Sequence, residues 1–243
     1  MAERRFVVEG PQAVREALAA GGLYELFSTG GAPELERAAA AAGTTVTLVD
    51  DAVLAAMTET VTPQGVLGVA PLLATGADRL PARPRLVAVL DAVNDPGNAG
   101  TVLRTADAAG ADAVLFTEGS TDPHGGKCVR ASAGSLWHLP VVTGLPVLAA
   151  VGLLREHGLQ VLATTGAGED DLDALQDDGL LGGPTAWVFG TEAHGLDGKV
   201  LAAADRRVRV PLHGRAESLN VAAAAAVCLY ASARSHRSGA DRA

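Results

Sequence analysis

From residue 85 onward the sequence alternates short apolar runs with segments of helical spacing, and few folds accommodate that alternation. The first run, LVAVLD, is apolar at every position before Asp91, which is typical of a strand buried on both faces of a parallel sheet. Further strands are expected at AVLF, LPVV, LQVLATT, TAWVFG and RVRVPL, and a long closing helix at SLNVAAAAAVCLYASAR. Alternating units of this kind predict an α/β domain with a mainly parallel sheet, in which ligands bind beyond the carboxyl ends of the strands.

The first 70 residues predict a separate, smaller α/β unit. Its expected strands are FVVEG, LYELFST, TTVTLVD and VTPQGVLGVAP, and its helices PQAVREALAAG and PELERAAAAAG each begin with Pro and end at Gly. Residues 71–84 are rich in Pro, Gly, Ala and Arg without periodicity and are expected to form a linker. The second domain is therefore predicted at 85–236, with a disordered tail at 237–243.

The charge is unevenly distributed along the chain, whose net charge is −9. Six acids and no base lie in residues 169–178, whereas residues 206–237 hold six arginines and one acid, Glu217. Because phosphate contacts supply much of the affinity for nucleic acid, any nucleic-acid contact is expected to be local and to lie in this arginine-rich stretch. Aromatic residues make up only 3%, which argues against an aromatic platform for stacked bases.

The two cysteines and the N-terminal segment exclude several other classes. Cys128 and Cys228 lie far apart without CxxC spacing, so neither a disulfide framework nor a thiolate zinc site is expected. The N-terminal MAERRFVVEG has no apolar core of a signal peptide, and no apolar run is long enough to cross a bilayer. A reducing, cytoplasmic setting is the expectation.

The loop after the first strand carries polar residues at the start of a helix. Asn98 follows the turn Asp95-Pro-Gly, and Arg104 lies opposite the apolar face of the helix that Gly110 ends. Free backbone N–H groups at such a helix start favour an anion. The alternative interpretation makes Asn98 a helix cap and Arg104 a solvated charge.

Two later loops carry similar ambiguous signals. After TAWVFG, Gly190 allows a close approach to the backbone, while Glu192 and His194 are equally compatible with solvated surface positions. In VRVPLHGRAESLNVAAAA, a strand ends near Pro211 and Leu212, and Ser218 or Asn220 caps the final helix. Taken singly, none of these residues identifies a function.

A dinucleotide-binding enzyme is the main competing class, because VLATTGAGEDD places a Gly-x-Gly after a strand. The third glycine of that fingerprint is missing, and Glu169 with the acids after it occupies the region where phosphates would lie. No Gly-rich loop with Lys-Ser or Lys-Thr marks a P-loop enzyme.

Together, the three loops resemble the three signature motifs of the SpoU family of RNA 2′-O-ribose methyltransferases (TrmH-like, SPOUT superfamily). That family has an Asn followed six residues later by an Arg, then a strand ending in Gly-x-Glu, then a Pro-bearing strand before Ser-Leu-Asn. The chain supplies this pattern in order and spacing across residues 85–234: Asn98 and Arg104, Gly190 and Glu192, Pro211, and Ser218, Leu219 and Asn220. KCVRASAGSLWHLPV is similar to the family segment between the first two motifs, and residues 1–70 resemble an L30e-like RNA-binding domain.

The resemblance implies an α/β fold with a deep trefoil knot formed by the second and third loops, a homodimer, and S-adenosylmethionine as cofactor. It implies cofactor contacts at Thr164, Gly190, Val210, Leu212 and Leu219, and catalytic roles for Asn98, Arg104, Glu192, Ser218 and Asn220. RNA contacts are expected at Arg130, Arg206, Arg207, Arg209 and Arg215, with neither a metal nor a membrane as partner.

The implied reaction transfers a methyl group to a ribose 2′-hydroxyl. Arg104 is often cast as the base in this family, but a guanidinium stays protonated in proteins. We expect Arg104 to grip an RNA phosphate and stabilise the developing alkoxide, while that phosphate or solvent takes the proton. Asn98, Ser218 and Asn220 would orient the ribose and Arg104, and Glu192 would hold the polar network. The expected substrate is large-subunit (23S) ribosomal RNA; a transfer-RNA methyltransferase and a non-catalytic RNA-binding protein are the alternatives.

Overall fold

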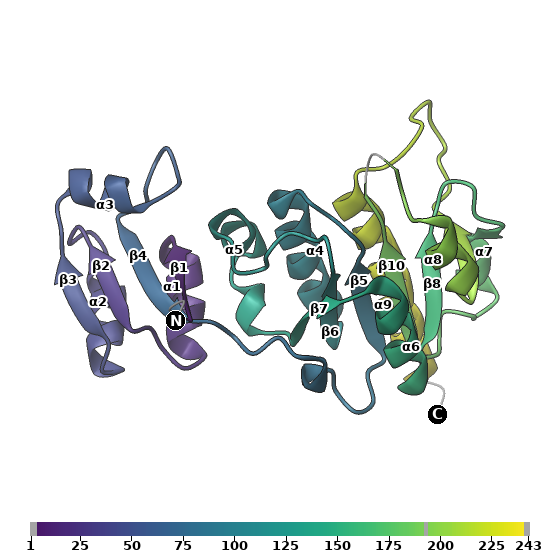
Figure 1. The fold of residues 1–243 in the computed structure, drawn as a ribbon, viewed down its shortest axis with the longest axis horizontal. Coiled ribbons are helices and arrows are strands. Elements are labelled where there is room, and N and C mark those ends of the chain that lie inside the picture. The colour runs from purple at the N-terminus through teal and green to yellow at the C-terminus, as the bar shows by residue number, and fades with distance from the viewer. Residues whose placement is uncertain (1–3, 192–193, 241–243) are drawn as a thin grey trace.

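The computed structural model describes residues 4–191 and 194–240 and divides them into two α/β domains side by side (Figure 1). The smaller domain has a four-stranded sheet in the order β1-β4-β2-β3. Its elements follow the expected sequence segments: β1 (Arg5–Glu9), α1 (Pro11–Ala19), β2 (Glu25–Ser28), α2 (Pro33–Ala41), β3 (Thr45–Leu48), α3 (Asp51–Met57) and β4 (Val66–Pro71). Helix α3 was not anticipated; Asp50 caps it by accepting a hydrogen bond from the N–H of Val53 at 2.7 Å.

The larger domain has a seven-stranded sheet in the order β7-β6-β5-β10-β8-β11-β9, and all its described strand pairs are parallel. The predicted mainly parallel α/β fold is confirmed. The strands are β5 (Leu86–Leu90), β6 (Ala113–Thr117), β7 (Val141–Leu145), β8 (Gln160–Thr164), β9 (Asp170–Asp171), β10 (Thr185–Phe189) and β11 (Arg206–Arg209). The helices are α4 (Pro96–Ala109), α5 (Gly126–Ser132), α6 (Val147–Glu156), α7 (Leu172–Asp177), α8 (Gly198–Ala203) and α9 (Val221–Ala240), with 3-10 turns η1 (Ala77–Arg79) and η2 (Ser135–Trp137).

Two cores lie on opposite faces of this sheet because successive side chains of each strand point in opposite directions. On β5, Ala88 and Leu90 join the core under α4 and α9, whereas Val87 and Val89 join the core under α6 and α8. The indole N–H of fully buried Trp187 donates to Ser232 at 2.9 Å and so fixes α9 against β10.

The two domains share a continuous core and meet where α5 packs against β1. Phe6 of β1 stacks on Trp137 and makes an edge contact with His124. Two groups of charged side chains flank this contact: Arg130 with Glu9, and His138 with Glu16 and Asp107. The domains are therefore joined by apolar packing as well as by the covalent connection.

The ends of the larger domain differ from the sequence-based expectation in two respects. The expected linker is fixed to the sheet edge, because Thr143 donates its N–H to Thr75 and the two hydroxyls are also bonded at 2.9 Å. Helix α9 continues to Ala240, four residues into the segment expected to be disordered. Residues 241–243 lie outside the described residues, and the trefoil knot stays a prediction.

Candidate active site

Three loops meet at one edge of the parallel sheet because they follow the parallel strands β5, β10 and β11, whose carboxyl ends point the same way. The first loop leads into α4. There Asp95, not Asn98, is the helix cap: its carboxylate accepts the N–H of Asn98 at 2.8 Å. The alternative interpretation of Asn98 as a cap is therefore wrong, and its side chain is available for another role.

That role is a contact between the first and third motifs. The Asn220 amide donates from Nδ2 to the Asn98 side-chain oxygen at 3.1 Å, although the two residues are 122 positions apart. The oxygen of the same Asn220 amide accepts the N–H groups of Ala222 at 2.9 Å and Ala223 at 3.3 Å. Asn220 thus caps α9, as expected, and holds Asn98 with its remaining donor.

Arg104 lies on α4, six residues after Asn98, and is exposed. Its exposure follows from the apolar residues of α4 facing the sheet, so that this position points to solvent. No residue within 4–191 or 194–240 forms a hydrogen bond or an ion pair with its guanidinium. A planar cation with five N–H donors is therefore held near Asn98 without a described carboxylate to neutralise it.

A pocket of about 200 Å³ lies beside this contact and is lined by the segments that follow β8, β10 and β11. Each of the five residues expected to touch the cofactor lines it, together with Ser218: Thr164, Gly190, Val210, Leu212 and Leu219. Leu212 and Leu219 keep 40% and 37% of their surface exposed, so an apolar ligand surface could cover them. The segment Thr164–Gly166 also lines the pocket, which assigns part of the Gly-x-Gly sequence to this site.

Steric crowding explains why position 190 is a glycine. A Cβ at this position would lie 2.4 Å from the backbone of Gly195 and 2.7 Å from the nitrogen of Leu196. The loop after β10 therefore folds back on its own start, and only glycine permits that approach. Ser218 is exposed, as is His194, whose N–H donates to the Thr191 hydroxyl. Glu192 lies outside the described residues.

Sequence reasoning missed one cation next to the first motif. Lys127, at the start of α5, forms an ion pair with Asp95 at 3.0 Å. The N–H of Asn98 and the ammonium of Lys127 both donate to the Asp95 carboxylate and lower its pKa. The signal was present in the segment KCVRAS, but the side on which α5 packs could not be read from it.

The expected RNA-binding arginines fall into two groups. Arg206, Arg207 and Arg209 of β11 pair with acids of the neighbouring segment at 3.3, 2.8 and 3.2 Å: Asp170, Glu169 and Asp171 respectively. Arg130 pairs with Glu9 at 2.7 Å. Arg215 is exposed and has no partner among the described residues. The acidic segment thus neutralises the strand in which RNA contact was expected, and RNA contact there stays a prediction.

Searches for two other kinds of feature were negative over the described part of the chain. No group of three or more His, Cys, Asp or Glu side chains could hold a metal ion. No helix among these residues is long and apolar enough to span a membrane. Both cysteines are buried, and burial raises the pKa of the Cys128 thiol to about 12.

Comparison with known families agrees with this geometry. Residues 85–230 match the model of the SpoU rRNA methylase family, and residues 7–74 match the RNA 2′-O ribose methyltransferase substrate-binding domain. The chain belongs to the SpoU methylase family. The first match contains the three loops described above, and the second contains the four-stranded domain.

Individual relatives span nearly the whole chain. The 23S rRNA (guanosine(2553)-2′-O)-methyltransferase RlmP of Bacillus subtilis is 36% identical over 233 residues, covering 93% of this chain and 87% of the relative. The AdoMet-bound rRNA methyltransferase from Sinorhizobium meliloti is 32% identical with a TM-score of 0.83, covering 95% and 87% of the two chains. The SpoU methyltransferase AviRb from Streptomyces viridochromogenes is 28% identical with a TM-score of 0.84, covering 97% and 91%.

Proposed function

We propose that this SpoU-family protein transfers a methyl group from S-adenosylmethionine to a ribose 2′-hydroxyl of 23S ribosomal RNA. The observation that carries the proposal is the Asn98–Asn220 contact beside a pocket lined by all five expected cofactor residues. The substrate class rests on the relative RlmP, whose name specifies 23S rRNA, and on the substrate-binding domain at residues 7–74.

The residues of the pocket fit the cofactor by shape and chemistry. Phe189, Val210, Leu212 and Leu219 offer apolar surface to an adenine ring, and loop backbone supplies polar groups around them. The hydroxyl of Thr164 already donates to the Val188 carbonyl at 2.9 Å, so its position is fixed before any ligand binds. When bound, the cofactor supplies a methyl group activated by the positive charge of its sulfonium.

The protein's contribution is alignment and electrostatic stabilisation. With the cofactor bound, its methyl group would be transferred to the 2′-oxygen, S-adenosylhomocysteine would be left, and an RNA phosphate or solvent would take the hydroxyl proton. Asn98 and Asn220 hold the ribose in line, and Ser218 adds a hydroxyl on the same side. Arg104 grips the neighbouring phosphate and stabilises the charge that develops on the 2′-oxygen. The role expected for Glu192, to hold the polar network, falls on a residue outside those that the structure describes.

A homodimer accounts for an apolar surface on the catalytic domain. Val227 and Tyr230, one turn apart on α9, keep 45% and 48% of their surface exposed. Val227 also lines a depression shared with Leu212 and Leu219, so the surface continues to the cofactor pocket. We infer that a second copy of the chain covers it. Light scattering should give the dimer mass for the native protein and the monomer mass for Val227→Asp; a monomeric native protein would contradict the inference.

The decisive experiment maps 2′-O-methyl groups in total RNA from cells with and without the gene. One ribose in 23S rRNA should lose its methyl group when the gene is absent and regain it when the purified protein and S-adenosylmethionine are added. If only a position in transfer RNA loses its methyl group, the substrate is transfer RNA. An unchanged map together with no cofactor binding would overturn the proposed activity. We place this activity in the cytoplasm, since its proposed substrate is ribosomal RNA.

A further inference from the structure

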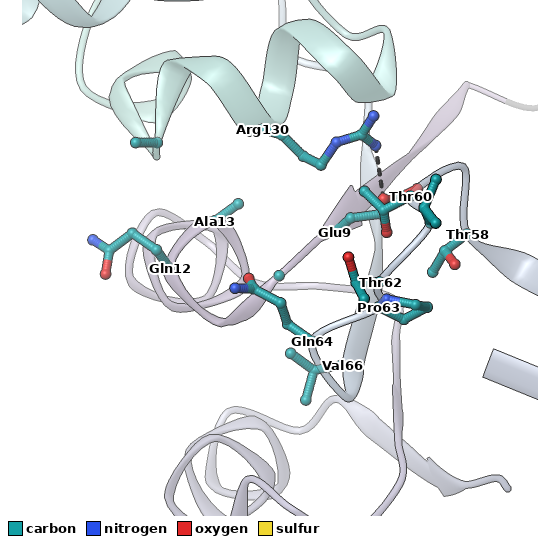
Figure 2. Close-up of a pocket in the computed structure, with 13 residues that line it drawn as sticks. Glu9, Gln12, Ala13, Thr58, Thr60, Thr62, Pro63, Gln64, Val66 and Arg130 are labelled. Carbon is teal, nitrogen blue, oxygen red and sulfur yellow. Dashed lines mark hydrogen bonds and ion pairs between the residues drawn. The ribbon is translucent and has the colours of Figure 1, made fainter. Parts of the chain in front are cut away.

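A second pocket, of about 430 Å³, lies between the two domains and away from the cofactor site. Three segments form its walls: the turn from β1 into α1, the loop between α3 and β4, and one side of α5 (Figure 2). Gln12 and Ala13 line it from α1, and Thr62 and Gln64 line it from the loop. The larger domain contributes Arg130 and Ala133 to its lining.

A buried ion pair makes this pocket a fixed structure. Glu9 is 6% exposed, and both of its carboxylate oxygens are used: one accepts the N–H of Glu59 at 2.9 Å, the other the Arg130 guanidinium at 2.7 Å. Burying a carboxylate is costly unless it is paired, so these contacts tie the three segments to one geometry. In Figure 2 the Arg130 side chain reaches from α5 to Glu9 across the top of the pocket.

The charges around the pocket disfavour a phosphate as its ligand. The only cation among its lining residues, Arg130, is already paired with Glu9, and a second carboxylate, Glu59, lies 4.0 Å from the same guanidinium. A phosphate here would meet two carboxylates for one cation. The ligand that fits carries polar groups without a negative charge.

The remaining lining chemistry favours a planar ligand with hydrogen-bonding edges. Across residues 4–191 and 194–240, no group forms a hydrogen bond with the side chains of Thr60, Thr62 or Gln64, which offer hydroxyl and amide donors and acceptors. Val61 is 99% exposed at the rim, and Ala13 with Val66 gives the pocket a buried apolar floor. Unstacked nucleobases have this combination of apolar faces and polar edges, and proteins recognise the edges of such bases in single-stranded RNA by hydrogen bonds.

The pocket is also rigidly connected to the candidate active site. Arg130 and Lys127 lie one turn apart on α5; Arg130 lines the pocket, and Lys127 pairs with the Asp95 that caps α4 before Asn98. Gly100 lets α5 approach α4 closely, since a Cβ there would lie 2.5 Å from the carbonyl oxygen of Cys128. In Figure 1 the loop after α3 and the loop before α9 both project from the upper edge of the molecule.

We propose that the interdomain pocket binds an unstacked nucleobase of the RNA substrate, on the same RNA as the ribose at Asn98. The proposal rests on the proposed function and names a recognition subsite for it. Thr62 and Gln64 bond the edge of the base, and Val61 covers one face. Because the pocket spans both domains, binding there selects RNA whose loop presents the base and the target ribose together.

The test uses Thr62→Val with Gln64→Leu, which removes polar groups without changing charge. Thr45→Val is the matched control, because Thr45 is an exposed threonine on β3 of the same domain, outside the pocket. With transcribed 23S rRNA, the double variant should raise KM about tenfold, as expected for two lost hydrogen bonds, and leave kcat and cofactor affinity unchanged. A KM equal to that of Thr45→Val would overturn the proposal.

A second measurement does not depend on methyl transfer or on the variant. Ultraviolet cross-linking of the native full-length protein to total cellular RNA should attach nucleotides within residues 58–66. Cross-links confined to other segments would overturn the proposal, as would free nucleosides binding in the pocket while RNA cross-links elsewhere. Failure of the proposed function would look different: no methyl transfer to any RNA, with the cross-link at residues 58–66 retained.

Discussion

Two sets of arginines near the candidate site differ in whether the fold places acidic side chains beside them. Those of β11 are paired one for one with the acids that precede α7. Arg104 on α4 and Arg215 in the loop before α9 are exposed, and no described residue pairs with either. This difference could not be read from the sequence, because it depends on the strand order that places β9 beside β11.

The difference shows how a chain of net charge −9 can be adapted to RNA. Gly168 lies so close to β11 that a Cβ would be 2.6 Å from the backbone nitrogen of Arg209, which fixes the acidic segment against the strand. The pairing is therefore part of the fold rather than a transient contact. Positive charge that no described acid neutralises remains where the ribose and its phosphate are expected.

The largest expected effect is on the rate of methyl transfer when an arginine of the exposed set is replaced. Arg104→Ala should reduce the rate of methyl transfer about 10²–10³-fold, the usual loss when a group that stabilises transition-state charge is removed. Affinity for S-adenosylmethionine, measured by calorimetric titration, should not change, because Arg104 does not line the cofactor pocket. Arg83→Ala, an exposed arginine of the linker, is the control and should behave as the native protein. An equal loss of methyl-transfer rate in Arg104→Ala and Arg83→Ala would show that Arg104 has no special role.

Asn220 separates structural from chemical contributions at the same site. Asn220→Ala should cost about 1 kcal/mol of stability through the lost cap of α9 and reduce methyl transfer as well. Asn220→Asp keeps the capping oxygen but loses the donor to Asn98, so its stability should be native while its rate falls about tenfold. Thermal unfolding and single-turnover rates measure the two effects. A fully active Asn220→Asp would show that the contact with Asn98 is dispensable.

Replacing an arginine of the paired set on β11 should have little effect on stability or on the affinity for RNA. Arg207→Ala breaks an exposed ion pair worth about 0–1 kcal/mol and should leave the affinity for RNA close to native. The dependence of log Kd on log salt should keep its slope, whereas an arginine that contacts single-stranded phosphate would lower the slope by about 0.7. The companion variant Glu169→Gln frees the same arginine. If Arg207→Ala lowers the slope of log Kd against log salt, β11 contacts the RNA and this prediction is wrong.

The smallest effect is a pH dependence at the domain boundary. Hydrogen bonds to Asp107 and Glu16 raise the pKa of His138 above its ordinary 6.5. Its contribution to stability is therefore complete below pH 6.5 and is lost as the pH rises through the raised folded pKa. The difference in unfolding free energy between the native protein and His138→Gln should shrink on going from pH 6 to pH 9. His213→Gln, in an exposed loop, is the control; a difference independent of pH would contradict this account.

Sequence and structure contributed unequally to this picture. The apolar runs specify β5 and β10 because buried parallel strands need apolar residues on both faces, and the motif order identified Asn98 and Asn220 before their contact was known. The capping role of Asp95 was missed, since Asp95 and Asn98 are both common cap residues and only the backbone decides between them. The pairing of Arg207 with Glu169 depends on strand order, which local sequence does not encode.

The most direct test of the central claim is the single-turnover rate of methyl transfer to 23S rRNA by Arg104→Lys. Lysine keeps the positive charge but lacks the planar fork that holds a phosphate at two points. If Arg104 acts as an electrostatic clamp on the RNA, the rate should fall at least about tenfold while cofactor affinity and stability stay native. Full activity in Arg104→Lys would contradict the account.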